Sequence, residues 1–188
     1  MNVVAEAYVQ GVSTRKVDEL VEAMGARGMS KSEVSRMAGV LDEQVKAFRE
    51  RPLEGDCPYL CLDAMYVNVR EASRVVSKAI LVAFSVNRDG QREVLGMAVA
   101  NGEMEPTWRS FLGGLVERGL KGVRLVISDA HSGLRKAVRK VLNGTRRQRC
   151  HVHFIRDVLS HAPKSAQGFV AAALRNVFQK TTVERARR

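Results

Sequence analysis

Two aspartates occupy positions in the sequence where a carboxylate is unusual. Asp63 lies in the middle of the apolar run YLCLDAMY, and Asp129 directly follows the apolar residues LVIS. An unpaired carboxylate in a buried strand costs several kcal/mol, so each is expected to have a partner or a cation. Carboxylates are hard ligands that suit Mg²⁺, and two such ions about 4 Å apart can assist an in-line phosphoryl displacement. Metal-assisted phosphoryl transfer is therefore the chemistry to consider if the fold brings the two residues together.

Each aspartate also has a purely structural interpretation. Asp63 could form a salt bridge with an arginine such as Arg70, and Asp129 could cap the helix that follows it. The presence of both aspartates on two strands that can be neighbours favours the functional interpretation. Gly133 would let the backbone turn closely past the site, and His131 could contact a phosphate or the metal shell, or could simply pack or cap.

The elements that must position these residues follow from the hydrophobic pattern. Apolar and β-branched runs predict strands, and periods typical of helices follow Glu105-Pro106 and Ser132. Asn87-Arg88-Asp89-Gly90 is a hairpin signal. Strands are predicted at 58–69, 73–86, 93–101, 122–128 and 146–154, and helices at 106–119, 132–142, 155–162 and 167–178.

The predicted order is β-β-β-α-β-α-β-α. The first three strands are expected to form an antiparallel meander, and the later strands, which arrive through helices, must pair in parallel. This α/β mixed sheet has the element order of the ribonuclease-H-like fold. In that topology the first and fourth strands are neighbours, so the carboxylates of Asp63 and Asp129 can meet.

Residues 1–50 are predicted to be helical. Ser13 can cap a first helix that ends near Gly25, a capping box from Ser30 to Glu33 opens a second, and a third begins at Leu41 and stops at Pro52. This is the layout of a helix-turn-helix module, although any small three-helix bundle reads the same way. The candidate DNA contacts on its second helix are Lys31, Ser32, Ser35 and Arg36.

The net charge of +11 is concentrated at one end of the chain. Residues 139–188 contain 12 lysines and arginines against two acids, whereas residues 1–138 are nearly balanced. Such a field attracts polyanions, most commonly nucleic acid, although a solubilising tail is the alternative. The candidate DNA contacts in this part are Arg146, Arg147 and Arg149.

Length and composition exclude several classes. The 188 residues allow one ordinary domain with a small addition. The sequence contains no run of about 18 apolar residues, which a membrane-spanning helix would need, and its first residues do not have the pattern of a signal peptide. Three cysteines do not make a disulfide framework, so a cytoplasmic protein is expected.

The chain resembles bacterial insertion-sequence transposases of the Mutator type. The matching stretches follow the family's order over nearly the whole chain: YVQGVSTRKV, SKSEVSRM, YLCLDAMYVNVRE, REVLGMAVANGE followed by Trp108, VERGLKGVRLVISDAHSGL and QRCHVHFIRDVL. The resemblance implies a DDE active site of ribonuclease-H-like fold, with Asp63 as the first catalytic and metal-binding acid and Asp129 as the second. It also implies two Mg²⁺ or Mn²⁺ ions in the complete enzyme.

The resemblance further implies partners and a location. The partners would be DNA at the element's terminal inverted repeats, target DNA, and further copies of the chain in a homo-oligomer. The location would be the bacterial cytoplasm, in association with the nucleoid. Water would nick the element end, and the freed 3′-hydroxyl would attack target DNA. The first fifty residues would belong to the region that binds the terminal repeats.

Cys150 and His153 also match the family. Alone they are half of a zinc site, because a closed site needs four ligands. Cys57 and Cys61 could supply the other half, but they flank the first strand. A packing and orienting role beside the active site is therefore favoured for Cys150 and His153.

One departure from the family is serious. The third acid of the family is a glutamate well downstream, whereas the only acids after Asp129 here are Asp157, where the family usually has Asn, and Glu184. An internal fragment with an incomplete site is expected. It would contain a helix-turn-helix segment at 1–50, a linker at 51–58, a partial catalytic core at 59–165 and the start of a truncated helical insertion at 166–188. A non-catalytic DNA-binding protein that competes for element ends is the alternative.

Overall fold

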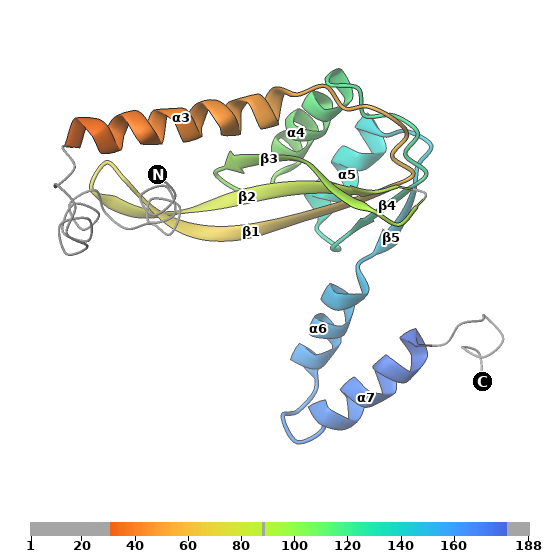
Figure 1. The fold of residues 1–188 in the computed structure, drawn as a ribbon. Coiled ribbons are helices and arrows are strands. Elements are labelled where there is room, and N and C mark those ends of the chain that lie inside the picture. Colours follow the sequence, from red (N-terminus) through yellow and green to blue (C-terminus); the bar gives the residue numbers. More distant parts are fainter. Residues whose placement is uncertain (1–30, 88, 180–188) are drawn as a thin grey trace. The chain divides into compact units, whose positions relative to one another are not determined.

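The computed structural model describes residues 31–87 and 89–179 (Figure 1). The chain forms two compact units, 1–51 and 52–188. The described part of the first unit is one helix, α3 (Lys31–Glu50). The prediction of two helices separated near Gly39 is wrong for this stretch. A glycine inside a helix costs only about 1 kcal/mol relative to alanine, and no proline occurs before Pro52, so the helix continues.

The helix-turn-helix assignment stays a prediction. Its first helix, expected to begin after Ser13, lies outside the described residues, as do the side chains of Lys31 and Ser35. Ser32 and Arg36 are exposed on α3.

The second unit contains a five-stranded mixed sheet, which confirms the predicted topology. Its strands are β1 (Tyr59–Glu71), β2 (Arg74–Val86), β3 (Arg92–Ala100), β4 (Leu125–Ser128) and β5 (Arg146–Arg149). β1, β2 and β3 pair antiparallel, while β4 pairs parallel with both β1 and β5. The resulting order, β3-β2-β1-β4-β5, is that of the ribonuclease-H-like fold and makes β1 and β4 neighbours.

The β2–β3 turn shows why its residues were a hairpin signal. The side-chain oxygen of Asn87 accepts hydrogen bonds from the backbone N–H groups of Asp89 (3.0 Å) and Gln91 (2.9 Å). Gly90 has a φ of +81°, a conformation that favours glycine. The turn closes the β2–β3 hairpin, whose first pair is Val86–Arg92.

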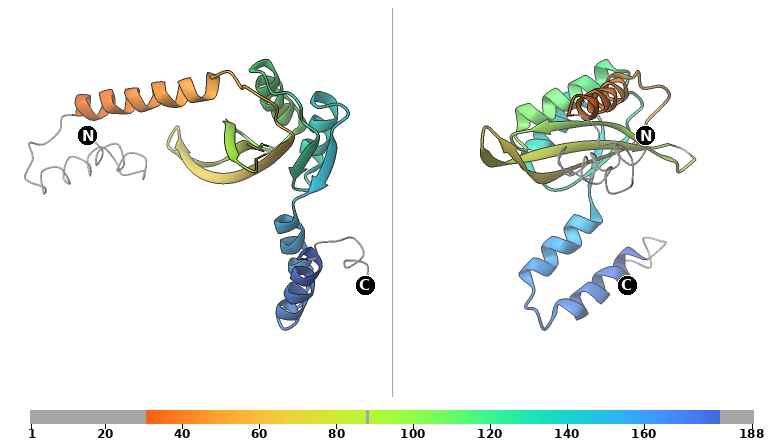
Figure 2. Two further views of the ribbon diagram at one scale, coloured as in Figure 1. Left: turned by 45° about the vertical axis from the view of Figure 1, so that its right-hand side comes forward. Right: turned by 60° about the vertical axis from the view of Figure 1, so that its left-hand side comes forward.

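The core lies between the sheet and two helices, α4 (Glu105–Glu117) and α5 (Ser132–Val141). Figure 2 shows these helices beside the sheet from two further sides. Alternation puts one side of each strand in this core, so Leu60 and Leu62 of β1 are buried. The helical members of the core are Trp108, Leu112, Leu115, Leu134, Ala137 and Val138. The intervening residues of β1, which include Asp63, belong to the other face of the sheet.

Most of residues 51–58, predicted to be a linker, belongs to the second unit, which begins at Pro52. The N–H of Leu53 donates to the carbonyl oxygen of Arg118 (2.7 Å), and that of Cys57 donates to Lys121 (3.0 Å). Cys57 is buried. These contacts hold the entry to β1 beside the turn that follows α4.

The end of the fifth strand differs from the prediction. β5 stops at Arg149, and α6 (His151–His161) begins where a strand was expected to continue to Phe154. The reason is that β4, its partner, ends at Ser128, whose carbonyl oxygen accepts the N–H of Cys150. Beyond that bond the sheet offers no further partner among the described residues, and a helix satisfies the backbone instead.

A second helix, α7 (Gln167–Phe178), follows α6 and contacts it through aromatic rings. The ring centroids of Phe154 and Phe178 are 6.0 Å apart. Within the described part of the chain, no helix is both long enough and apolar enough to cross a membrane.

Candidate active site

The register between β1 and β4 brings the two predicted acids to the same level. Cys61 pairs with Ile127, and this is the last pair of the parallel ladder. Asp63, within β1, follows Cys61 by two residues. Asp129, directly after β4, follows Ile127 by two residues. Because side chains alternate along a strand, Asp63 lies on the same face as Cys61 and away from the buried Leu60 and Leu62.

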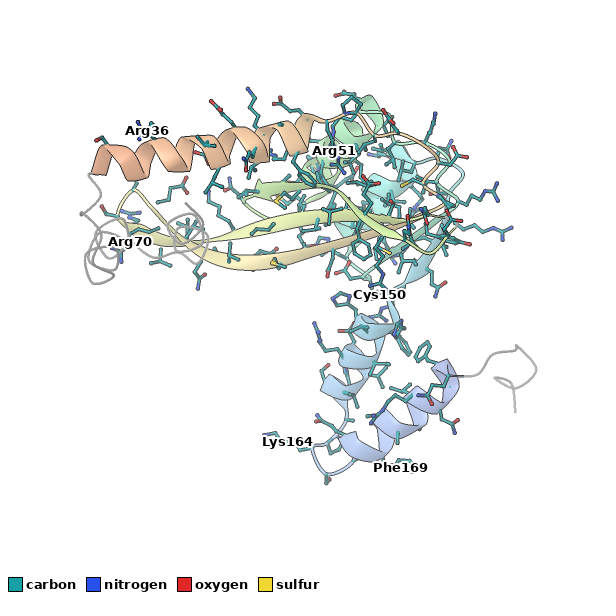
Figure 3. All side chains as sticks on the ribbon, in the orientation of Figure 1. Arg36, Arg51, Arg70, Cys150, Lys164 and Phe169 are labelled. Carbon is teal, nitrogen blue, oxygen red and sulfur yellow. The ribbon has the colours of Figure 1, made fainter. Side chains whose placement is uncertain are left out.

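Asp63 is more exposed than its apolar neighbours suggested. Its side chain is 56% exposed, and its nearest basic group among the described residues is His153, whose Nε2 lies 3.8 Å from Oδ1. The expectation of a desolvated charge in a strand covered on both faces is therefore wrong, because only one face of β1 is buried at this point. Figure 3 shows Arg70, the alternative partner, toward the tip of the β1–β2 hairpin.

Asp129 is held rigidly at the end of β4. Its Oδ1 accepts the N–H of His131 at 2.9 Å, a local bond to the residue before α5. The N-cap of α5 is His131 and makes no side-chain capping hydrogen bond, so the helix-capping alternative for Asp129 is not observed. Its carbonyl oxygen accepts hydrogen bonds from Arg147 Nη1 (2.8 Å) and Ser128 Oγ (3.0 Å). The second carboxylate oxygen, Oδ2, has no hydrogen-bond donor within the described ranges, and it is the one left for a ligand.

The three supporting residues flank the two aspartates. His131 occupies the N-cap position of α5, and Cys150 occupies that of α6, with His153 in the first turn of the same helix. The Nδ1 atoms of His131 and His153 are buried and have no partner among the described residues. Burial raises the pKa of the Cys61 thiol; Arg92 opposes this shift, and Cys150 adds to it.

Glu103, in the loop between β3 and α4, is a site residue that the sequence analysis did not identify. Burial raises the pKa of its carboxyl group, and the negative charges of Asp129 and Asp63 act in the same direction. His131 and a hydrogen bond with Tyr66 oppose the shift. A third carboxylate therefore lies near the predicted pair. Its only sequence signal is its place in the matching stretch REVLGMAVANGE, which lies upstream of Asp129, whereas the third acid of the family is expected downstream.

Gly133 allows the Glu103 loop to approach the helix that follows Asp129. A Cβ atom at Gly133 would lie 2.7 Å from the carbonyl oxygen of Glu103 and 2.9 Å from the nitrogen of Glu105. Both are backbone atoms, which cannot move aside as a flexible side chain can. The absence of a side chain at position 133 thus lets the loop rest directly on the first turn of α5.

Gly133→Ala is expected to destabilise the protein by about 1–3 kcal/mol, because the new methyl group must displace the loop backbone. The matched control is Gly113→Ala in α4, where a Cβ meets nothing within 4 Å. There the helix preference of alanine should add up to about 1 kcal/mol. Urea unfolding of the two variants gives the comparison. Equal stability of Gly133→Ala and the parent chain would contradict the close packing of the loop.

The basic residues predicted to bind DNA are not equivalent. Arg149 forms an ion pair with Asp157, and its guanidinium lies 5.3 Å from the centroid of the Phe154 ring. This pairing gives a physical reason for the acid at position 157. Arg146 is exposed, whereas Arg147 is half-buried against the carbonyl of Asp129.

The donor chemistry of the site suits a hard divalent cation. Asp63 and Asp129 present carboxylate oxygens on neighbouring strands, and Mg²⁺ commonly takes one or two carboxylates and keeps waters for the rest of its shell. Within residues 31–87 and 89–179, no group of three His, Cys, Asp or Glu side chains is arranged as a metal site.

Two retroviral structures show remote similarity to the chain. A simian T-cell lymphotropic virus intasome in complex with a PP2A regulatory subunit gives a TM-score of 0.37 at 12% identity, over 65% of this chain and 50% of that one. The HTLV-2 integrase catalytic core, in complex with magnesium, gives a TM-score of 0.35 at 10% identity. The match covers 71% of this chain and 91% of the integrase chain. Similarity at this level supports no conclusion about the chain, and the fold assignment is based on strand order and register.

Curated relatives match along almost the whole chain. The transposase for IS256 in transposon Tn4001 from Staphylococcus aureus is 43% identical over 97% of this chain and 47% of its own length. The transposase for IS1081 from Mycobacterium tuberculosis is 44% identical over 97% of this chain and 44% of its own length. The transposase for IS406 from Burkholderia multivorans is 46% identical over 96% of this chain and 48% of its own length. The chain spans about half the length of these relatives.

The family profile described as "Transposase, Mutator family" matches residues 1–188. The identities to the transposases of several insertion sequences agree with it. The chain belongs to the Mutator family of transposases.

Proposed function

We propose that this chain provides two of the three carboxylates of a DDE transposase active site, Asp63 and Asp129. The reaction would be metal-dependent hydrolysis and strand transfer of DNA phosphodiesters at the ends of an insertion sequence. The observation that supports it most is the β1–β4 register, in which the pair Cys61–Ile127 precedes the two aspartates by two residues on each strand. Membership of the Mutator family supports the reaction class.

Asp63 and Asp129 would hold Mg²⁺ or Mn²⁺, and a divalent ion bound there would activate the attacking oxygen and stabilise the leaving one. Arg147 fixes the backbone of Asp129 through its carbonyl oxygen. His153 lies beside Asp63, and its charged form would lower the local negative charge when no cation is bound. Glu103 adds further negative potential, which favours a cation over an anion at this place.

The partners in this proposal are the terminal inverted repeats of an element, target DNA and further copies of the chain. The basic residues of β5, Arg146, Arg147 and Arg149, would contact phosphates, and residues 1–50 would select the element end. Phosphate contacts fix position without reading sequence, whereas base contacts give preference. The two parts of the chain are thus expected to affect DNA binding differently.

Removal of residues 1–50 is expected to reduce the preference for element-end DNA more than it reduces total affinity. The reason is that most of the positive charge lies in residues 139–188, and affinity through phosphates falls steeply with salt. Fluorescence anisotropy with an element-end duplex and a scrambled duplex, over a series of salt concentrations, measures both quantities. An unchanged preference after the deletion would show that the helix-turn-helix assignment is wrong.

A further inference from the structure

A cavity of about 350 Å³ lies between α5 and β5. Three arginines line it, Arg135 and Arg139 from α5 and Arg147 from β5, together with the polar residues Asn143 and Thr145. No acidic residue belongs to its lining. The cavity is thus a concave site with three positive charges and no opposite charge.

The three guanidinium groups converge because of the local structure. Arg135 and Arg139 are four residues apart and therefore share one face of α5. Val126 of β4 pairs with Arg147, which puts Arg147 on the face of the sheet that α5 covers. Among the described residues, no acid forms an ion pair with Arg135 or Arg139, in contrast to Lys140, which pairs with Glu105 at 2.6 Å.

The electrostatics of Arg147 agree with this arrangement. Burial lowers the pKa of its guanidinium, and the positive charges of Arg135, Arg139 and Arg149 lower it further, against the opposing effect of Asp129. Like charges held together in this way repel one another. An anion in the cavity would relieve that repulsion.

We propose that this cavity is a phosphate-binding site that holds one backbone phosphate of DNA. Guanidinium groups bind phosphate oxygens through charge-assisted and often bidentate hydrogen bonds, which lysine does not match. Arg147 joins the cavity to the catalytic region, since its Nη1 also donates to the carbonyl oxygen of Asp129 (2.8 Å) and to Ser128 Oγ (3.2 Å). A phosphate bound there would set the position of the DNA strand relative to Asp129.

The identity of the ligand as DNA rests on the proposed function, whereas the phosphate chemistry rests on the cavity alone. Inorganic phosphate offers the same oxygens as a backbone phosphate, so the experiment needs one arm for each source. A matched control is available on the same helix, because Lys136 is exposed and does not line the cavity.

The first arm measures binding of a labelled duplex by fluorescence anisotropy at several salt concentrations. Arg135→Gln and Arg139→Gln are each expected to weaken binding by about tenfold at low salt and to reduce the slope of log K against log salt by about one. Lys136→Gln, which removes the same charge from the same helix, should stay within about twofold of the parent chain with an unchanged slope. Equal effects of all three variants would overturn the proposal, because they would show a diffuse field.

The second arm titrates the parent chain with inorganic phosphate and follows the arginine Nε–Hε signals by NMR. The signals of Arg135, Arg139 and Arg147 should shift together, and Arg139→Gln should abolish the shift of the other two. Failure of these signals to respond would overturn the proposed site. A response to phosphate without any binding of duplex would support the cavity and count against the proposed function. The opposite result is duplex binding that depends no more on Arg135 and Arg139 than on Lys136. That result would count against the cavity and would be compatible with the proposed function.

Discussion

Duplex DNA from the end of an insertion sequence is expected to remain uncleaved and unjoined when the 188-residue chain is incubated with it and Mg²⁺ or Mn²⁺. Two aspartates can hold one ion, but the second ion of a two-metal site needs a further carboxylate. Without it, both activation of the nucleophile and stabilisation of the leaving oxygen are lost, effects worth several kcal/mol of barrier. The rate should therefore fall below detection.

The acids available in the chain support this expectation. Asp157 is engaged in an ion pair with Arg149, and Glu184 lies outside the described residues. Glu103 is near the aspartate pair, and burial raises the pKa of its carboxyl group. None of the three stands where the family is expected to have its glutamate, well downstream of Asp129.

Nicking of an end-labelled duplex, resolved on denaturing gels, tests this prediction, with Asp63→Ala as the control for contaminating nucleases. Metal-dependent nicking by the parent chain that disappears in Asp63→Ala would contradict it and show a working site. In that case Glu103→Ala, Asp157→Ala and Glu184→Ala would identify the residue that serves as the third acid.

The sheet and the aspartate pair could be predicted because local patterns determine them. Strand-length apolar runs, a hairpin turn at Asn87–Gly90 and two helical crossovers leave few topologies, and the one observed makes β1 and β4 neighbours. Given that order, Asp63 and Asp129 each follow the last pair of the β1–β4 ladder, Cys61–Ile127, by two residues. The concentration of positive charge in residues 139–188 was equally visible in the sequence.

Other features depend on tertiary structure and could not be read in this way. The apolar run around Asp63 gives no sign of which face is covered, and the side chain is 56% exposed. The alternation in RRQRCHVHF is typical of a strand, but the partner strand ends at Ser128 and the chain forms α6 instead. Glu103 approaches the site from a loop that rests on Gly133, a contact that residue spacing does not reveal.

Asp63→Asn and Asp129→Asn are each expected to weaken Mn²⁺ binding by about tenfold or more. Loss of a group in the outer shell of a metal site typically costs 10–100-fold, and replacing a charged ligand by a neutral amide should cost no less. Because Asp63 is more than half exposed, its replacement should change the free energy of unfolding by no more than about 0.5 kcal/mol. Loss of affinity would therefore not reflect loss of structure.

Titration of the 188-residue chain with Mn²⁺, with free ion measured by electron paramagnetic resonance, tests the central claim that these two aspartates form a metal site. Asp157→Asn is the matched control, because it makes the same change at an acid that is paired with Arg149. The account predicts that affinity falls in Asp63→Asn and in Asp129→Asn and is retained in Asp157→Asn. Mn²⁺ binding that is equal in all three variants and the parent chain would contradict it.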